Sequence, residues 1–188
     1  PGFARTGQAF FGFARHGIVP DMITMGKPMG NGIPISGLAA KEDVLAAFSD
    51  KLPYFNTFGG NPVSIAAAQA VLKYIKDENL QEHCKKAGAA LLKALKEVQE
   101  RHPESVGDVR GAGLFLGFEF VKNDGNKTPD KDMALNVIEM LRDEHILTSV
   151  IGHYGNILKL RPPMVFSEND IDWFATSLDK CITKLENK

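Results

Sequence analysis

The chain has 188 residues, of which 44% are hydrophobic and 24% are charged, and its formal net charge at pH 7 is −1. This composition is typical of a folded globular protein and excludes a disordered or fibrous chain. The near-neutral balance provides no basic surface for nucleic acid or anionic lipid, and no apolar run approaches the ~20 residues that a membrane span needs. We therefore expect no nucleic acid and no membrane among the partners.

Residues 1–75 alternate short apolar runs with glycine and proline. In this part we predict short strands over 21–25 and 35–40 and a short helix over 41–48. Strands separated by helical stretches are typical of an α/β layer, so we expect the two strands to be parallel. From Pro62 a longer helix should run to about Asp77, with Asn61 as its N-cap.

From Leu80 the pattern changes to amphipathic helices, because apolar residues recur at every third or fourth position. The helices predicted on this basis run from 80 to about 102, around 134–141 and over 171–185. The strands predicted between them cover 106–110, 114–121, 146–150 and 157–160. We therefore divide the chain into part of one layer, residues 1–75, and a compact α+β unit, residues 76–188.

The two cysteines, Cys84 and Cys181, lie far apart, and each falls within a helical pattern. Such a pair predicts neither a disulfide scaffold nor a metal site, so we expect two reduced, buried thiols. A reducing compartment such as the cytoplasm fits this expectation.

Lys27 is the first candidate functional residue. It directly follows a predicted strand, where ligands bind at the carboxyl ends of parallel strands, and Pro28 biases it toward an extended or turn conformation. A P-loop is excluded because proline, rather than serine or threonine, follows the lysine. Lys27 either forms a Schiff base with a carbonyl cofactor such as pyridoxal phosphate or is a solvated lysine in a turn, and its spacing alone favours the second alternative.

Residues 56–62 (NTFGGNP) are the second candidate. A glycine pair before a capped helix presents free backbone N–H groups and the positive end of the helix dipole, and Thr57 adds a hydroxyl donor. A phosphate would suit this arrangement, although a tight turn that merely starts a helix explains it equally well.

Arg161 is the third candidate. Leu158 and Leu160 should face the core, which places Lys159 and Arg161 on the opposite face of their strand. The planar guanidinium suits bidentate binding of a carboxylate. The alternative, which the local sequence favours, is a surface arginine on an edge strand that ends at two prolines.

Other signals predict no site. Residues 111–117 faintly resemble a dinucleotide-binding fingerprint, but the residues after the glycines alternate like a strand and do not open a helix. The five histidines are scattered, so we predict no metal site, and no serine nucleophile motif is present.

Five segments in this order resemble the class III pyridoxal-phosphate-dependent aminotransferases. They are residues 2–7 (GFARTG), 20–27 (PDMITMGK), 56–62 (NTFGGNP), 107–111 (GDVRG) and 160–163 (LRPP). The resemblance covers essentially the whole chain. The lysine segment and residues 153–159 look closest to the alanine–glyoxylate-type aminotransferases and the amino-phosphate phospho-lyases.

This resemblance implies an α/β fold of fold type I that works as a homodimer with pyridoxal 5'-phosphate. Residues 1–75 match the C-terminal part of the large, cofactor-binding domain, and residues 76–188 match the small domain. Lys27 matches the Schiff-base lysine, which also moves the proton between the substrate's α-carbon and the cofactor. Thr57 matches the residue that reaches the phosphate of the partner's cofactor, and Arg161 matches the arginine that binds the substrate's α-carboxylate.

The resemblance also implies an N-terminal half of the large domain that is not in this sequence, which begins with Pro-Gly-Phe. That half supplies the aspartate that pairs with the pyridine nitrogen. Without the aspartate the cofactor is a weaker electron sink, so we expect the 188 residues alone to be an inactive fragment.

The activity expected of the enzyme is amino-group transfer from an amino acid to a 2-oxo acid. Arg161 favours this activity because it suits an α-carboxylate, whereas the phospho-lyases of the family tend to carry lysine at that place. Three alternatives stay open: a phospho-lyase acting on an amino-alcohol phosphate, a decarboxylase, and a non-catalytic fragment that only self-associates through exposed apolar surface.

Overall fold

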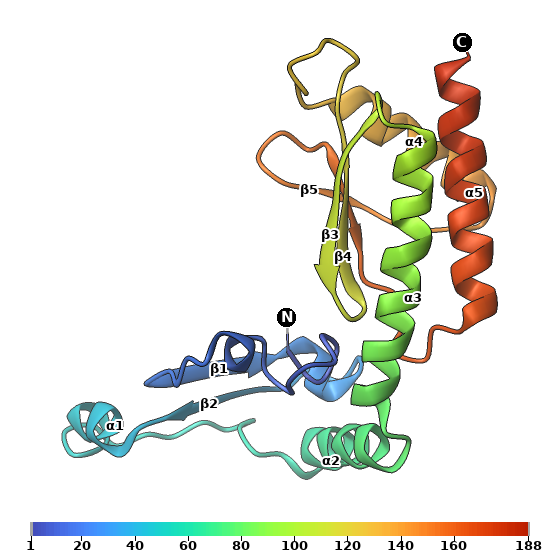
Figure 1. Ribbon diagram of the computed structural model, residues 1–188. Coiled ribbons are helices and arrows are strands. Elements are labelled where there is room, and N and C mark those ends of the chain that lie inside the picture. Colours follow the sequence, from blue (N-terminus) through green and yellow to red (C-terminus); the bar gives the residue numbers. More distant parts are fainter. Residues whose placement is uncertain (1, 188) are drawn as a thin grey trace.

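The computed structural model describes residues 2–187, and Figure 1 shows their elements in two groups. The first group contains η1 (Gly12–His16), β1 (Met22–Gly26), η2 (Lys27–Gly30), β2 (Ser36–Ala40), α1 (Glu42–Ser49) and α2 (Pro62–Asp77). The second contains α3 (Leu80–Arg101), β3 (Val106–Ala112), β4 (Phe115–Phe120), α4 (Lys131–Asp143), β5 (Val150–Ile151), β6 (Ile157–Leu160) and α5 (Glu168–Glu186).

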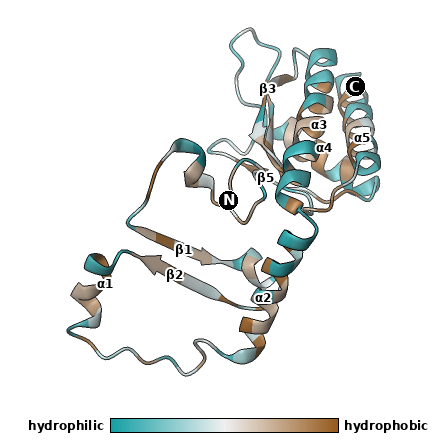
Figure 2. Cartoon of the chain, turned by 60° about the horizontal axis from the view of Figure 1, so that its bottom comes forward, coloured by the Kyte–Doolittle hydropathy of each residue, from teal (hydrophilic) through white to brown (hydrophobic). Residues whose placement is uncertain are grey.

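β1 and β2 form an antiparallel pair, in which Met22 lies opposite Ala40 and Gly26 opposite Ser36 (Figure 2). The prediction of parallel strands was therefore wrong. The connection over residues 27–35 is shorter than the dozen or so residues that a parallel crossover needs. The chain turns back at η2 and returns at once, and the short helix α1 follows both strands instead of joining them.

The second group is built on a four-stranded antiparallel sheet in the order β3-β4-β6-β5. Helices α3, α4 and α5 cover one face of this sheet, and α5 packs against both α3 and α4 (Figure 1). Side chains on β4 and β6 alternate between buried and partly exposed. The core between the sheet and the helices therefore takes every second strand residue, as the sequence pattern predicts.

The long helices form where the sequence predicts them, since local signals fix their ends. Asn61 caps α2 as expected, because its Oδ1 accepts a hydrogen bond from the Ser64 N–H (3.0 Å). Ser167 and Asp170 form a capping box at the start of α5. None of the helices within residues 2–187 combines the length and the apolar composition needed to span a bilayer.

One predicted strand is much shorter than expected. Of residues 146–150 only Val150 joins a strand, β5, which pairs with β6. Before it the chain runs beside β6 with two hydrogen bonds, from the Lys159 N–H to the Ser149 carbonyl (2.8 Å) and from the Thr148 hydroxyl to the Lys159 carbonyl (3.4 Å). The apolar residues in this segment line a pocket instead of extending the sheet.

Both cysteines are free and buried, which confirms the prediction for them. Burial raises the pKa of the thiols of Cys84 and Cys181 above the usual value. These thiols are therefore packing residues with little thiolate character.

Candidate active site

Lys27 is the first residue of η2 and directly follows β1. Its backbone lies in the left-handed region, with φ of 52°, which costs a residue with a side chain about 1–2 kcal/mol. Such strain persists only where the surrounding structure holds it, and it is concentrated at functional sites. The side chain is exposed, so the amine is accessible from solvent. The turn conformation agrees with the expectation for a residue before Pro28.

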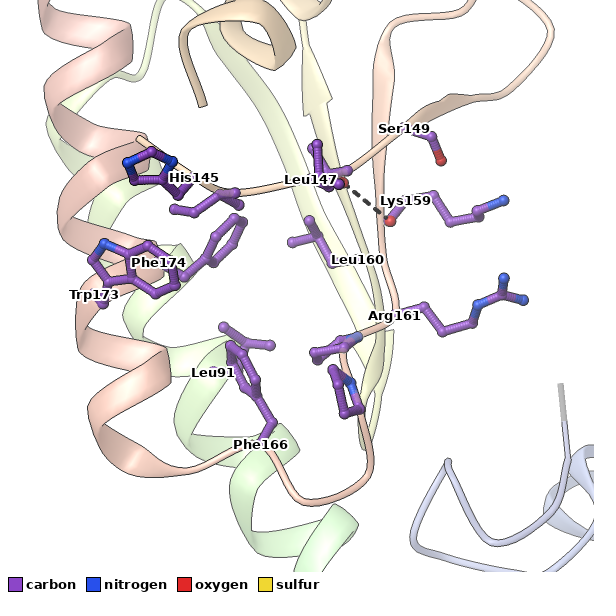
Figure 3. Close-up of a pocket in the computed structure, with 14 residues that line it drawn as sticks. Leu91, His145, Leu147, Ser149, Lys159, Leu160, Arg161, Phe166, Trp173 and Phe174 are labelled. Carbon is purple, nitrogen blue, oxygen red and sulfur yellow. Dashed lines mark hydrogen bonds between the residues drawn. The ribbon is translucent and has the colours of Figure 1, made fainter. Parts of the chain in front are cut away.

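Arg161 follows the last residue of β6 and is also exposed. Leu158 and Leu160 face the core, so the prediction that Lys159 and Arg161 lie on the other face of the sheet is confirmed. Figure 3 shows both of these cationic side chains pointing the same way, away from Trp173. Within residues 2–187 the Arg161 guanidinium forms no ion pair, so it is available to an anion.

A small hydrophobic cluster lies between the segments that carry these two residues. Its buried members are Phe3, Ala4, Ile75 and Leu80, and we refer to it as the junction cluster. Met25 and Met29, on either side of Lys27, pack against it, and so does Met164, three residues after Arg161. One cluster therefore supports both candidate residues, although they belong to different groups of elements.

The turn that carries Thr57 is built by asparagine side chains. Asn56 Oδ1 accepts hydrogen bonds from the N–H groups of Phe58 (3.1 Å) and Gly59 (3.0 Å), and Asn61 Nδ2 donates to the Phe58 carbonyl (3.0 Å). Two of the backbone donors that the sequence suggested for an anion are therefore already satisfied. The Thr57 side chain itself is exposed.

Thr57 is not a member of the junction cluster, but helix α2, which follows its turn, is attached to the chain after Lys27. The Ser64 hydroxyl, in the first turn of α2, donates to the Pro34 carbonyl (3.0 Å), and α2 also contacts η2. The segments that carry Lys27 and Arg161 therefore pack against the same cluster. The Thr57 turn is connected to the Lys27 segment through the contacts of α2.

A cavity of about 470 Å³ lies on the core side of β6. Its walls include Leu91, Leu160 and Phe174, and Figure 3 shows that Lys159 and Arg161 point away from it although both are at its edge. Lys27 and Thr57 do not line it. Lys27 and Thr57 are therefore separate from the cavity, and Arg161 lies at its edge with its side chain directed away from it.

Arg5 is a charged residue near Arg161 for which the sequence predicted no role. Its Nη1 donates hydrogen bonds to the carbonyls of Pro162 and Leu114, the second at 3.4 Å. Burial lowers the pKa of Arg5 from its usual value, and the charge of Arg161 lowers it further. Arg5 lies in one of the segments quoted above, but its partners are more than a hundred residues away. No local pattern in the sequence can therefore reveal them.

The Aminotransferase class-III family model matches residues 1–182. The chain is 43% identical over 185 residues to "Ethanolamine-phosphate phospho-lyase homolog 1" of Caenorhabditis elegans. It is 39% identical over 184 residues to "Alanine--glyoxylate aminotransferase 2 homolog 2, mitochondrial" of Arabidopsis thaliana. The two matches cover 97% and 98% of this chain but 39% and 38% of the relatives, so the chain spans about two fifths of their length.

Two solved structures are similar over nearly the whole chain. A phospholyase from Arthrobacter in complex with phosphoethanolamine has a TM-score of 0.93 at 38% identity, covering 97% of this chain and 43% of that one. A transaminase from the marine bacterium Virgibacillus has a TM-score of 0.89 at 31% identity, covering 99% and 44%. The predicted fold type I is thereby confirmed. With both the family model and these relatives matching along its length, the chain belongs to the class III aminotransferases, a pyridoxal-phosphate-dependent family.

Proposed function

We propose that the protein containing this chain transfers amino groups from an amino acid to a 2-oxo acid with pyridoxal phosphate as cofactor. The observation that carries this proposal is the junction cluster, because the segments that carry an exposed amine, Lys27, and an exposed guanidinium, Arg161, both pack against it. An amine and a carboxylate-binding cation held on one support are what the reaction requires of this part of the chain. The identity to an alanine–glyoxylate aminotransferase homolog points the same way.

The residues present fit the cofactor. Lys27 offers an amine that forms no ion pair within residues 2–187, and the Thr57 hydroxyl lies on an exposed turn that precedes a capped helix. When bound, pyridoxal phosphate supplies an aldehyde that condenses with amines and a ring that withdraws electrons from the substrate's α-carbon. Lys27 Nζ would bond covalently to the cofactor and then, once freed, move the proton at the α-carbon. Thr57 Oγ1 would donate to the phosphate.

Arg161 would orient the substrate by binding its α-carboxylate through two parallel N–H donors. Its backbone is fixed on one side by β6, in which Leu160 pairs with Leu116. A guanidinium on such a rigid base keeps its direction, and orientation of a bound substrate lowers the barrier of the later steps.

The proposal includes a homodimer in which Thr57 serves the cofactor of the partner. The residues around Thr57 support this, since Phe55, Phe58 and Val63 are 86%, 81% and 70% exposed. Large apolar side chains gathered at one place are typical of a surface that another chain covers.

A second candidate is elimination of phosphate from an amino-alcohol phosphate. The 43% identity to a phospho-lyase homolog and the TM-score of 0.93 to a phospholyase favour it. Arg161 favours transamination, because an amino-alcohol phosphate has no carboxylate for this side chain to bind. The two reactions differ in their products, so one assay of each decides between them.

The test uses the full-length protein with alanine and glyoxylate in one assay and phosphoethanolamine in the other. We expect amino transfer, little release of phosphate, and a pyridoxyl group on the peptide containing Lys27 after borohydride reduction. Lys27→Ala should lower kcat at least a hundredfold, since a lost proton-transfer group alone costs about 10²–10⁴-fold. Lys76→Ala, at an exposed lysine on α2, serves as the control. Unchanged turnover in Lys27→Ala would reject the proposal.

A further inference from the structure

The loop over residues 2–11 has an unusual backbone conformation that internal hydrogen bonds stabilise. The Ala4 N–H donates to the Phe10 carbonyl (2.9 Å), and the Gly7 N–H donates to the Ala4 carbonyl (2.8 Å). Phe3 and Ala4 have φ of 55° and 65°, a region that residues with side chains rarely adopt. Ala4 is fully buried. Two consecutive residues in this conformation show that the surroundings determine the shape of the loop.

The loop touches the small α+β group through backbone atoms. The Leu114 N–H donates to the Arg5 carbonyl (3.0 Å). A Cβ on Gly113 would lie 2.4 Å from the same carbonyl oxygen, and a Cβ on Gly88 would lie 2.2 Å from the Gly113 carbonyl carbon. The absence of side chains at these glycines lets the loop, the β3–β4 turn and α3 approach each other this closely.

The Arg5 side chain extends this contact to the segment after Arg161. Its Nη1 donates to the Pro162 carbonyl and to the Leu114 carbonyl. The backbone is therefore held on both sides of Arg161. Leu160 before it pairs with Leu116 in the sheet, and the carbonyl of Pro162 after it accepts a hydrogen bond from Arg5. Because the proline ring already fixes φ of Pro162, holding its carbonyl fixes the remaining torsion of that residue.

The charge of Arg5 also acts on Arg161. No carboxylate within residues 2–187 forms an ion pair with Arg5, whose hydrogen-bond acceptors are neutral carbonyls. Part of its positive charge is therefore not compensated, and it repels a second guanidinium nearby. This repulsion disfavours folding of the Arg161 side chain back onto the loop and favours the outward direction shown in Figure 3.

We propose that Arg5 is a positioning residue for Arg161, because it holds the Pro162 carbonyl and keeps the neighbouring guanidinium directed outward. Arg5 itself touches neither substrate nor cofactor in this role. The inference rests on the proposed function, since it concerns the residue that would bind the substrate's carboxylate.

The first test compares Arg5→Met and Arg5→Lys in the full-length protein. We expect Arg5→Met to raise KM for alanine about tenfold, corresponding to about 1.4 kcal/mol, while kcat changes less than about twofold. KM for isopropylamine, which has no carboxylate, should stay unchanged. Arg5→Lys should recover part of the loss because it keeps the charge. Arg15→Met, at an exposed arginine bonded to Gln8, is the matched control. Equal changes for both amines would mean a merely structural role and would overturn the inference.

The second test does not depend on activity. Amide hydrogen exchange over residues 164–166 should accelerate in Arg5→Met and recover in part in Arg5→Lys, because the carbonyl before this segment is released. Unchanged exchange would overturn the inference even if KM moved. If the unaltered protein transfers no amino group but exchange accelerates as expected, the contact is supported and the proposed function is the part that fails.

Discussion

His102 at the end of α3 lies against Glu186 at the end of α5, with 2.7 Å between Nδ1 of the imidazole and Oε2 of the carboxylate. The imidazole is 6% exposed, and its Nε2 lies 3.2 Å from Asp179, also on α5. His102→Ala would leave both carboxylates without this partner. We expect it to lower the free energy of unfolding by about 1–3 kcal/mol, measured by urea denaturation. Lys180→Ala, which removes an exposed pair with Glu144, should change it by less than about 1 kcal/mol.

Gly88→Ala should separate α3 from the β3–β4 turn. Its Cβ would meet the backbone of Gly113 at 2.2 Å, and backbone cannot move aside as a flexible side chain can. We expect a loss of about 2–3 kcal/mol in thermal or urea unfolding. Gly125→Ala is the comparison, since that glycine has φ of 73° but no atom near a Cβ. A smaller loss at Gly88 than at Gly125 would contradict the close contact.

Asp170→Asn should change how the free energy of unfolding depends on pH in the acidic range. Hydrogen bonds from the backbone N–H and the hydroxyl of Ser167 lower the pKa of the Asp170 carboxyl. A lowered pKa adds stability above the usual carboxyl pKa, and this stability is lost as the pH falls through the lowered value. The variant should therefore be less stable than the parent at pH 7, and the difference should shrink as the pH falls through the lowered pKa. Urea unfolding of both proteins from pH 7 downward measures the difference in unfolding free energy. A difference that does not change with pH would be evidence against the capping box.

Thr57→Val should weaken cofactor binding in the full-length protein if Thr57 donates to the phosphate. We expect the Kd of pyridoxal phosphate to rise about tenfold or more, because a hydrogen bond to a charged group is lost. Thr57→Ser keeps the hydroxyl and should bind nearly as the parent does. Fluorescence titration measures the affinity, and equal values for all three proteins would exclude Thr57 from the phosphate site.

Arg161→Lys should shift preference away from amino acids. The lysine ammonium is a point charge and cannot form two parallel bonds to a carboxylate, so KM for alanine should rise about tenfold. Phosphoethanolamine turnover should fall less or rise. Steady-state kinetics with both substrates checks this, with cofactor absorbance as the control for intact binding. A larger loss with phosphoethanolamine would favour the phospho-lyase activity for the parent.

The sequence predicted those parts of the fold that depend on neighbouring residues. Helix α2 starts at Pro62 after the Asn61 cap, and α3 follows its apolar periodicity as far as Arg101. The sequence did not predict the direction of β2 relative to β1, because that direction depends on the short turn over residues 27–35. The strand expected over 146–150 is shorter in the structure because Ile146 and Leu147 line a pocket, and only Val150 pairs with β6.

In the candidate site, too, the sequence predicted local features but missed contacts between distant residues. The strand face of Arg161 followed from the burial of its alternate neighbours, and that prediction is confirmed. The roles of Lys27, Thr57 and Arg161 in binding cofactor and substrate remain predictions. Arg5 was missed because its acceptors, Leu114 and Pro162, follow it by 109 and 157 positions. A contact of that separation leaves no periodic trace in a single sequence.

Met25, Met29 and Met164 all pack against the junction cluster. Methionine is unbranched and adapts its shape readily, so we expect a bulkier side chain at position 25 or 29 to be compensated through the cluster by a shorter one at position 164. A second substitution that restores a protein damaged at position 25 or 29 is therefore expected more often near Arg161, in the other half of the chain, than among the sequence neighbours of Lys27.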